Sequence, residues 1–198
     1  MTAMTEAQPA QKGRPRDEWI PDAVFTATRE LLAEVGYQAL TIAAIAERSN
    51  TSKPAIYRRW PSKAHIVHEA VFPQTLHMPQ PTDDFAADLG AIIRGTVELF
   101  ATPAARAATP GLLGEMVARP DLQQALTGRF RDSVWAWLDE RIERAVHDGS
   151  VRPNVDVQLL VESILGAVIL AGVFRGPTLA TGTWADDLAA EILEGLSG

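Results

Sequence analysis

The chain has 198 residues, of which 46% are apolar, and this length can bury a sizeable core in one or two domains. It contains no cysteine, which excludes disulfides, zinc ribbons and thiol catalysis and is typical of a cytoplasmic protein. The net charge of −7 is unevenly divided, since residues 12–63 carry nine Lys and Arg against six Asp and Glu, whereas residues 64–198 carry nine against 18. Any attraction to nucleic acid must therefore be confined to the N-terminal part.

Residues 1–16 are polar and lack an apolar segment, so they predict no secretory signal. We expect them to form a disordered basic arm that carries Arg14 and Arg16. Such an arm could follow a DNA backbone or enter an adjacent minor groove. A disordered, solubilising tail explains the same composition equally well.

Residues 41–63 predict two short helices joined by a tight turn. Thr41 can cap the first helix, and Asn50 suits a turn that needs a positive φ. The first helix has an apolar face at helical spacing: Ile42, Ile45 and Ala46. The second helix can begin at Ser52, with Pro54 in its first turn, although proline leaves the cap ambiguous.

The second short helix carries one apolar stripe, formed by Ile56 and Trp60. Its other side chains are left facing outward: Lys53, Ala55, Tyr57, Arg58 and Arg59. A helix of two turns is not stable alone, so we expect it to present these side chains while neighbouring helices hold it.

These outward side chains suit duplex DNA. In a major groove, Lys53 and Arg58 could donate to guanine and Ala55 could contact a thymine methyl group. Hydroxyl and ammonium groups nearby suit phosphate oxygens. The predicted DNA contacts are Arg14, Arg16, Thr41, Thr51, Ser52, Lys53, Ala55, Tyr57, Arg58 and Lys63. The alternative is a helical hairpin with a solvated basic face.

Residues 17–72 combine the pair Gly36-Tyr37, the run Leu40-Thr41-Ile42 with Ile45-Ala46, and the run Ser52–Lys63. In these motifs they resemble the DNA-binding domain of tetracycline-repressor-like (TetR family) regulators. Asn50 departs from the glycine that the family usually has in the turn. The resemblance implies an all-α fold, with a helix-turn-helix domain at residues 17–63 and a helical ligand-binding and dimerisation domain at residues 64–198.

Apolar periodicity predicts helices through the remaining chain, without strand-like alternation. We expect a linker helix at residues 62–72 and a loop around Pro73, Pro79 and Pro81. The following helices are expected at residues 84–100, 110–118, 122–149, 155–174 and 184–196.

Residues 155–174 are apolar on nearly every side, which predicts that a second copy of the chain covers part of this helix. The predicted homodimer interface comprises Leu160, Ile164, Ala167, Val168, Ala171, Leu188 and Ile192. A central helix of a monomeric core is the alternative. The longest apolar run, residues 164–174, is too short to span a bilayer, so we expect no membrane contact.

The resemblance also implies a ligand pocket between the linker helix and the helices that follow. Large apolar residues could line it: Phe72, Phe85, Phe100, Met116, Phe130 and Trp137. These residues equally suit a core, but as pocket walls they predict a hydrophobic or aromatic small-molecule effector.

No constellation of residues indicates catalysis, a cofactor or a metal. His65, His68 and Glu69 lack a third ligand at metal spacing and fit the face of the linker helix. Three hypotheses remain: a dimeric repressor that binds a palindromic operator and is released by an apolar effector, a regulator of the same fold without a small-molecule ligand, and an all-α enzyme or carrier. The first is favoured.

Overall fold

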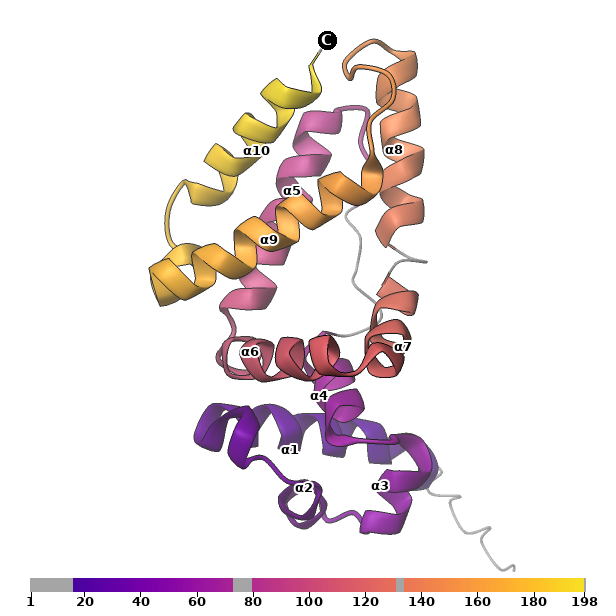
Figure 1. Cartoon of the computed structure of the whole chain (residues 1–198), viewed down its shortest axis with the longest axis vertical. Coiled ribbons are helices and arrows are strands. Elements are labelled where there is room, and N and C mark those ends of the chain that lie inside the picture. The colour runs from indigo at the N-terminus through magenta and orange to yellow at the C-terminus, as the bar shows by residue number, and fades with distance from the viewer. Residues whose placement is uncertain (1–15, 73–79, 131–133, 198) are drawn as a thin grey trace, which may run out of the picture.

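The computed structural model describes residues 16–72, 80–130 and 134–197, and the regular elements of this part of the chain are all helical (Figure 1). The predicted all-α fold is confirmed. The N-terminal helices are α1 (Arg16–Ala39), α2 (Ile42–Arg48), α3 (Lys53–Arg59) and α4 (Lys63–Val71). They are followed by α5 (Phe85–Ala101), α6 (Pro103–Ala118), α7 (Pro120–Phe130), α8 (Ala136–His147), α9 (Val157–Arg175), the 3₁₀ segment η2 (Gly176–Ala180) and α10 (Trp184–Leu196).

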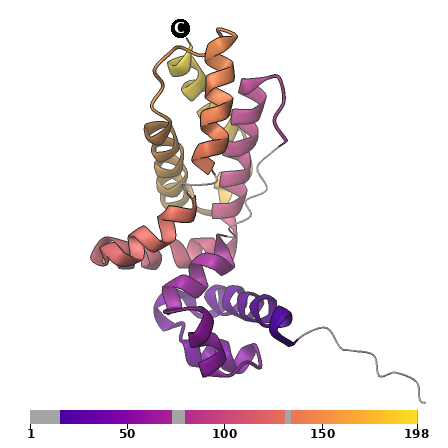
Figure 2. The ribbon, with the colours of Figure 1, turned by 90° about the vertical axis from the view of Figure 1, so that its right-hand side faces the viewer.

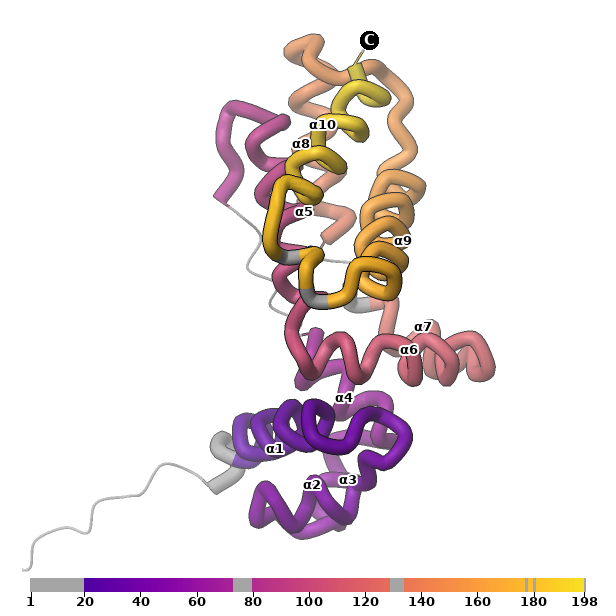
Figure 3. Tube along the Cα trace, turned by 90° about the vertical axis from the view of Figure 1, so that its left-hand side faces the viewer, coloured from indigo at the N-terminus to yellow at the C-terminus, as the bar shows by residue number. Residues whose placement is uncertain are grey.

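The helices form two groups along the long axis of the molecule (Figure 1). Helices α1–α4 lie at one end, and α6 crosses over them, with α7 beside it. Helices α5, α8, α9 and α10 form a bundle at the other end, in which α9 and α10 lead away from the η2 turn (Figure 3). Viewed from the side, α6 and α7 project from the base of this bundle (Figure 2).

Two hydrophobic cores correspond to these groups. The first joins α1–α4 with residues of α6 and α7, among them Leu112 and Leu122. The second joins α5, α8, α9, η2 and α10. The packing therefore does not follow a boundary after residue 63, because α6 and α7 share their core with the N-terminal helices.

Helix α6 begins earlier than its predicted start at Pro110. Thr102 caps it by accepting a hydrogen bond from the Ala105 N–H at 3.2 Å, and Pro103 occupies the first turn. Pro110 lies inside the helix. The prediction was wrong because it took Pro110 as the start of the helix and overlooked the Thr102-Pro103 pair.

The single helix predicted at residues 122–149 is two helices, α7 and α8. Leu122 and Leu126 of α7 pack in the first core, whereas Leu138 and Ile142 of α8 pack in the second. The apolar period is helical on both sides of residues 131–133, which lie outside the described residues. A periodic pattern does not reveal that a helix changes direction, so the prediction joined them.

A buried ion pair connects α5 and α8. Arg141 Nη2 lies 2.5 Å from Asp88 Oδ2, and the side chains are 6% and 2% exposed. Asp88 also accepts from the Thr82 N–H at 3.0 Å and from the Thr82 hydroxyl at 2.8 Å, while Arg141 donates to the Thr82 carbonyl oxygen at 2.5 Å. The pair thereby fixes the chain that enters α5 against α8. Nothing in the sequence indicated that Asp88 and Arg141 meet, because they are far apart along the chain.

Candidate nucleic-acid interface

The predicted caps and turn of the helix-turn-helix are confirmed. The Thr41 hydroxyl oxygen accepts a hydrogen bond from the Ala44 N–H at 3.1 Å, and the Ser52 hydroxyl oxygen accepts from the Ala55 N–H at 3.4 Å. Asn50 has a φ of 50°. Asparagine tolerates this left-handed conformation better than most residues, so it can replace glycine in the turn.

Buried aromatic and aliphatic side chains hold α3 in place. Ile56 is fully buried and Trp60 is 3% exposed. The Trp60 ring meets Phe25 edge to face at a centroid distance of 5.5 Å, and its indole N–H donates to Glu69 Oε2 at 2.9 Å. Helix α3 is thereby packed against α1 and α4, which supplies the support that a two-turn helix needs.

The outer face of α3 exposes Lys53, Tyr57 and Arg58, as predicted, with 55% of Tyr57 accessible. Ala55 is half-buried. Arg59, which was also expected to face outward, is half-buried as well. The exposed side chains offer an ammonium, a phenol and a guanidinium on one short helix, which suits hydrogen bonding to base edges and phosphates.

The other predicted DNA contacts differ in how exposed their side chains are. Thr41 and Ser52 are exposed at the helix N-termini, and Thr51 is half-buried with its hydroxyl donating to the Ser49 carbonyl oxygen at 3.2 Å. Arg14 lies outside the described residues, and Arg16 is the first residue of α1.

Lys63 is engaged within the protein. Its Nζ donates to the Tyr37 carbonyl oxygen at 2.9 Å and lies 4.2 Å from the centroid of the Tyr37 ring. This internal contact of Lys63 could not be predicted from the sequence, because Tyr37 lies 26 positions away. An ammonium has three donors, so a phosphate contact remains compatible with this anchoring.

Arg48 is an exposed cation of α2 that is already paired. Its two terminal nitrogens each donate to a carboxylate oxygen of Glu34 at 2.8 Å, and Glu30 lies 3.4 Å away. This guanidinium holds the pKa of Glu34 below its usual range. Arg48 therefore connects α2 to α1, and its charge is largely balanced locally.

Arg58 is the predicted contact with the sharpest functional test. Because its exposed guanidinium can bind a guanine edge in bidentate geometry, Arg58→Ala should weaken operator binding by about 1–3 kcal/mol and relax base preference at one position of each half-site. Tyr57→Phe removes only a phenolic hydroxyl and should weaken binding similarly on all sequences. Titrations on a panel of single-base operator variants measure both effects; an unchanged base preference for Arg58→Ala would exclude base recognition by Arg58.

The predicted pocket residues whose side chains are described are divided between the two cores. The rings of Phe72 and Phe100 are in contact, with centroids 5.1 Å apart. Phe85 lies at the opposite end of α5, about 22 Å from Phe100 at 1.5 Å per residue. Met116 packs against the first core and Trp137 against the second, while the Phe130 side chain lies outside the described residues. Aromatic character alone could not show that two cores share these residues.

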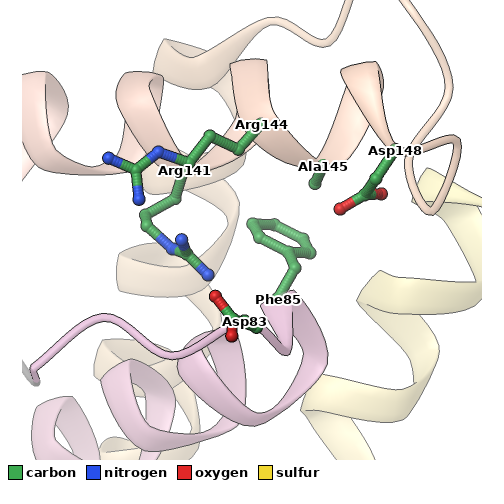
Figure 4. A pocket seen from close by; sticks show the side chains of 6 residues that line it. All are labelled: Asp83, Phe85, Arg141, Arg144, Ala145 and Asp148. Carbon is green, nitrogen blue, oxygen red and sulfur yellow. The ribbon is translucent and has the colours of Figure 1, made fainter.

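A small hollow of about 160 Å³ lies where α5 begins beside α8, and Figure 4 shows Phe85 at its centre. Its wall is mostly charged and comprises Asp83, Phe85, Arg141, Arg144, Ala145 and Asp148. Of the predicted pocket residues, Phe85 is the member that lines it. This hollow differs in place and polarity from the predicted apolar pocket.

Four predicted interface residues instead face the interior of their own subunit. Leu160, Ile164, Val168 and Ala171 are between 0% and 9% exposed, and they contribute to the second core. Ala167, Leu188 and Ile192 are half-buried. The prediction for the four was wrong because a helix that is apolar all round has no polar face to reveal its direction.

The opposite face of α9 is exposed and apolar: Leu159 is 60%, Leu170 56%, Val173 68% and Phe174 79% exposed. Within the described residues, α9 is the one helix whose length and composition would also suffice to cross a bilayer. The apolar run at residues 164–174 is only the C-terminal part of this helix, which begins at Val157. Exposed apolar side chains that lie together on one face are typical of an interaction surface.

The histidines and acids of α4 have other contacts. The Ser62 hydroxyl lies 2.9 Å from His65 Nδ1, the His68 ring packs beside Phe72, and Glu69 accepts from Trp60. Among the residues that the structure describes, no group of three His, Asp or Glu side chains is placed to hold a metal ion.

A supported two-turn helix with exposed basic and phenolic side chains, preceded by a capped helix and a left-handed turn, defines a helix-turn-helix DNA-binding protein. Residues 24–70 match the model of the bacterial regulatory proteins of the tetR family, and residues 79–192 match the tetracyclin repressor-like C-terminal domain. The chain belongs to the TetR family of transcriptional regulators. The matching families and relatives are transcriptional regulators rather than enzymes.

Curated relatives agree with this assignment. An HTH-type transcriptional regulator of Mycobacterium tuberculosis (strain H37Rv) is 31% identical over 85% of this chain and 86% of its own. YdeS, an HTH-type transcriptional regulator of Bacillus subtilis, is 26% identical over 84% and 85%. The DNA-binding transcriptional repressor TetR of Mycobacteroides abscessus is 26% identical over 73% and 77%.

Solved structures share the fold. Salmonella enterica GusR superimposes with a TM-score of 0.69 at 19% identity, covering 94% of this chain and 98% of its own. FadR from Bacillus subtilis, in complex with stearoyl-CoA, gives a TM-score of 0.55 at 17% identity, with coverage of 87% and 95%.

Proposed function

We propose that the protein is a homodimeric repressor that binds a two-fold symmetric operator through α3 and is released when an apolar small molecule binds. The observation that carries the DNA part of this proposal is the exposure of Lys53, Tyr57 and Arg58 on a helix whose other side is buried. The acidic remainder of the chain confines the attraction for DNA to this unit, which favours selected sites over general coating. The likeness to a repressor from Mycobacteroides abscessus supports repression as the direction of control.

The second element of the proposal is the homodimer. The exposed apolar side chains of α9 lie together on one face rather than scattered over the surface. A second copy of the same face could cover them around a two-fold axis. Half-buried apolar residues of α10, Leu188 and Ile192, extend the same bundle and remain proposed interface residues together with Ala167. A dimer of this kind would present two α3 helices, as a palindromic operator requires.

The effector is the third element. We propose a hydrophobic or aromatic compound that binds near the contact between Phe72 of α4 and Phe100 of α5, because this contact joins the end of the linker helix to the bundle. A ligand with a long apolar acyl chain also occurs in a protein of the same fold, since FadR of Bacillus subtilis was solved with stearoyl-CoA. The alternative is a regulator of the same fold that responds to no small molecule.

Selection from a pool of random duplexes tests the DNA-binding function. The expected result is a pair of inverted half-sites spaced about one helical turn, or a multiple of it, from centre to centre. Recovery of sequences without a common motif would contradict operator binding. A single half-site without symmetry would contradict binding as a dimer.

Effector binding should be coupled reciprocally to operator binding. An apolar compound found by thermal shift should lower operator affinity about 5- to 150-fold, and saturating operator should weaken binding of that compound by the same factor, because the two sites share one linkage free energy. Calorimetry with and without operator measures this factor. Equal affinity of the compound in both titrations would show a bystander site and favour the alternative without an effector.

A further inference from the structure

The ring of Tyr37 lies between the DNA-binding helices and α6. Tyr37 is 4% exposed and directly follows Gly36, whose φ of 72° breaks the helical course of α1. A Cβ atom placed on Gly111 of α6 would lie 2.2 Å from Cδ1 and 2.7 Å from Cγ of this ring. Atoms do not approach so closely without a bond, so glycine at position 111 is what allows α6 to pack directly against Tyr37.

Tyr37 also determines where the Lys63 ammonium lies. Its carbonyl oxygen accepts a hydrogen bond from Lys63 Nζ at 2.9 Å, and the ammonium lies 4.2 Å from the ring centroid, within the range of a cation–π interaction. Burial raises the pKa of Tyr37, and a hydrogen bond to Glu115 of α6 and the charge of that carboxylate raise it further, so the phenol is neutral and does not attract the ammonium as a phenolate would. Lys63 is therefore held by two separate groups of one residue.

This anchor lies close in sequence to another proposed DNA contact. The Tyr37 carbonyl precedes by four residues the exposed N-cap Thr41, whose hydroxyl is a proposed phosphate contact. Lys63 is the first residue of α4, directly after the segment that leaves α3. A lysine fixed here would add one positive charge next to the helix-turn-helix, where it could meet a phosphate of bound DNA.

We infer that Tyr37 is a positioning residue that holds the Lys63 ammonium for a DNA phosphate, and that α6 sets the position of Tyr37 through its contact at Gly111. This inference rests on the proposed binding of DNA by α1–α4. A displacement of α6 would then move Tyr37, and Lys63 would move with it. The helix bundle could thereby change the affinity for DNA without moving α3.

The salt dependence of DNA binding tests the first half of the inference. The probe is a duplex that the wild-type protein recovers from a random pool. Lys63→Met should make the slope of log affinity against log salt shallower by about 0.9, the value for one lost phosphate contact. Tyr37→Leu removes the ring but keeps the backbone carbonyl and the charge of Lys63, so it should make the slope shallower by a part of this amount. The double variant should have the slope of Lys63→Met alone, because Tyr37 acts on the DNA contact only through Lys63. Tyr37→Phe is the control, since it keeps the ring that Lys63 contacts and removes only the hydroxyl, which interacts with Glu115 rather than with Lys63.

These outcomes separate positioning from a structural role. If Tyr37→Leu lowers the melting temperature but leaves the salt slope at its wild-type value, Tyr37 only stabilises the fold and the inference fails. Additive changes of slope in the double variant would also overturn it. A wild-type protein that recovers no common sequence would instead contradict the proposed function itself.

A single methyl group tests the second half. Gly111→Ala should weaken binding of the same duplex about 10-fold and reproduce the shallower salt slope, because its Cβ must displace the Tyr37 ring. Gly114→Ala is the matched control on the same helix, since its Cβ would meet nothing within 4 Å. Adding Tyr37→Leu to Gly111→Ala should cause no further loss of affinity. Wild-type affinity in Gly111→Ala, or equal losses in both alanine variants, would contradict the role of α6.

Discussion

Leu170→Asp is expected to convert the protein to a monomer and to weaken operator binding on the order of 100-fold or more. Leu170 is 56% exposed on the apolar face of α9, so in the proposed dimer its replacement would place an unpaired charge in an interface from which water is excluded. The monomer would retain one α3 helix and bind one half-site. The second half-site contributes through a high effective concentration, and its loss removes this gain. Light scattering and operator titration measure the two effects.

A matched control distinguishes the interface from general surface effects. Val35 of α1 is 49% exposed, and Val35→Asp introduces the same charge on a different helix. It should leave the dimer intact. A wild-type protein that is monomeric at micromolar concentration, or a Leu170→Asp variant that remains dimeric, would contradict an interface at this face.

Asp88→Asn should destabilise the protein by about 3–5 kcal/mol, the largest effect on folding that we expect from a single polar substitution. The buried Arg141 guanidinium would lose its carboxylate, and a charge without a counter-charge is strongly unfavourable in a medium of low polarity. Thr82 would also lose the carboxylate that accepts its N–H and hydroxyl. Denaturant unfolding measures the change in the free energy of unfolding.

Two comparisons make this prediction specific. The pair of Arg119 and Asp121 is solvent-exposed, with side chains 48% and 74% accessible, so Asp121→Asn should change stability far less than Asp88→Asn. The double variant Asp88→Leu with Arg141→Met should recover much of the loss, because apolar residues of similar volume often replace a buried ion pair without penalty. A double variant as unstable as Asp88→Asn would show that packing, rather than the unpaired charge, dominates.

Local interactions explain why the DNA-binding unit could be predicted from the sequence. A cap, a left-handed turn and a two-turn helix depend on residues within four positions of one another, so Thr41, Asn50 and Ser52 indicate them directly. The stripe of Ile56 and Trp60 likewise follows from the helical period. Lys53, Tyr57 and Arg58 lie outside this buried stripe, so the same period indicates that they are exposed.

Contacts between distant segments decided what the sequence could not. Residues 122–149 keep one apolar period although α7 and α8 belong to different cores. Helix α9 is apolar on all sides, and only its packing against α5 distinguishes buried Ile164 from exposed Leu170. Asp88 and Arg141 are 53 positions apart, and Tyr37 and Gly111 are 74 apart. Periodicity and capping describe neighbours along the chain, whereas which side chains meet across such separations depends on how the helices pack in three dimensions.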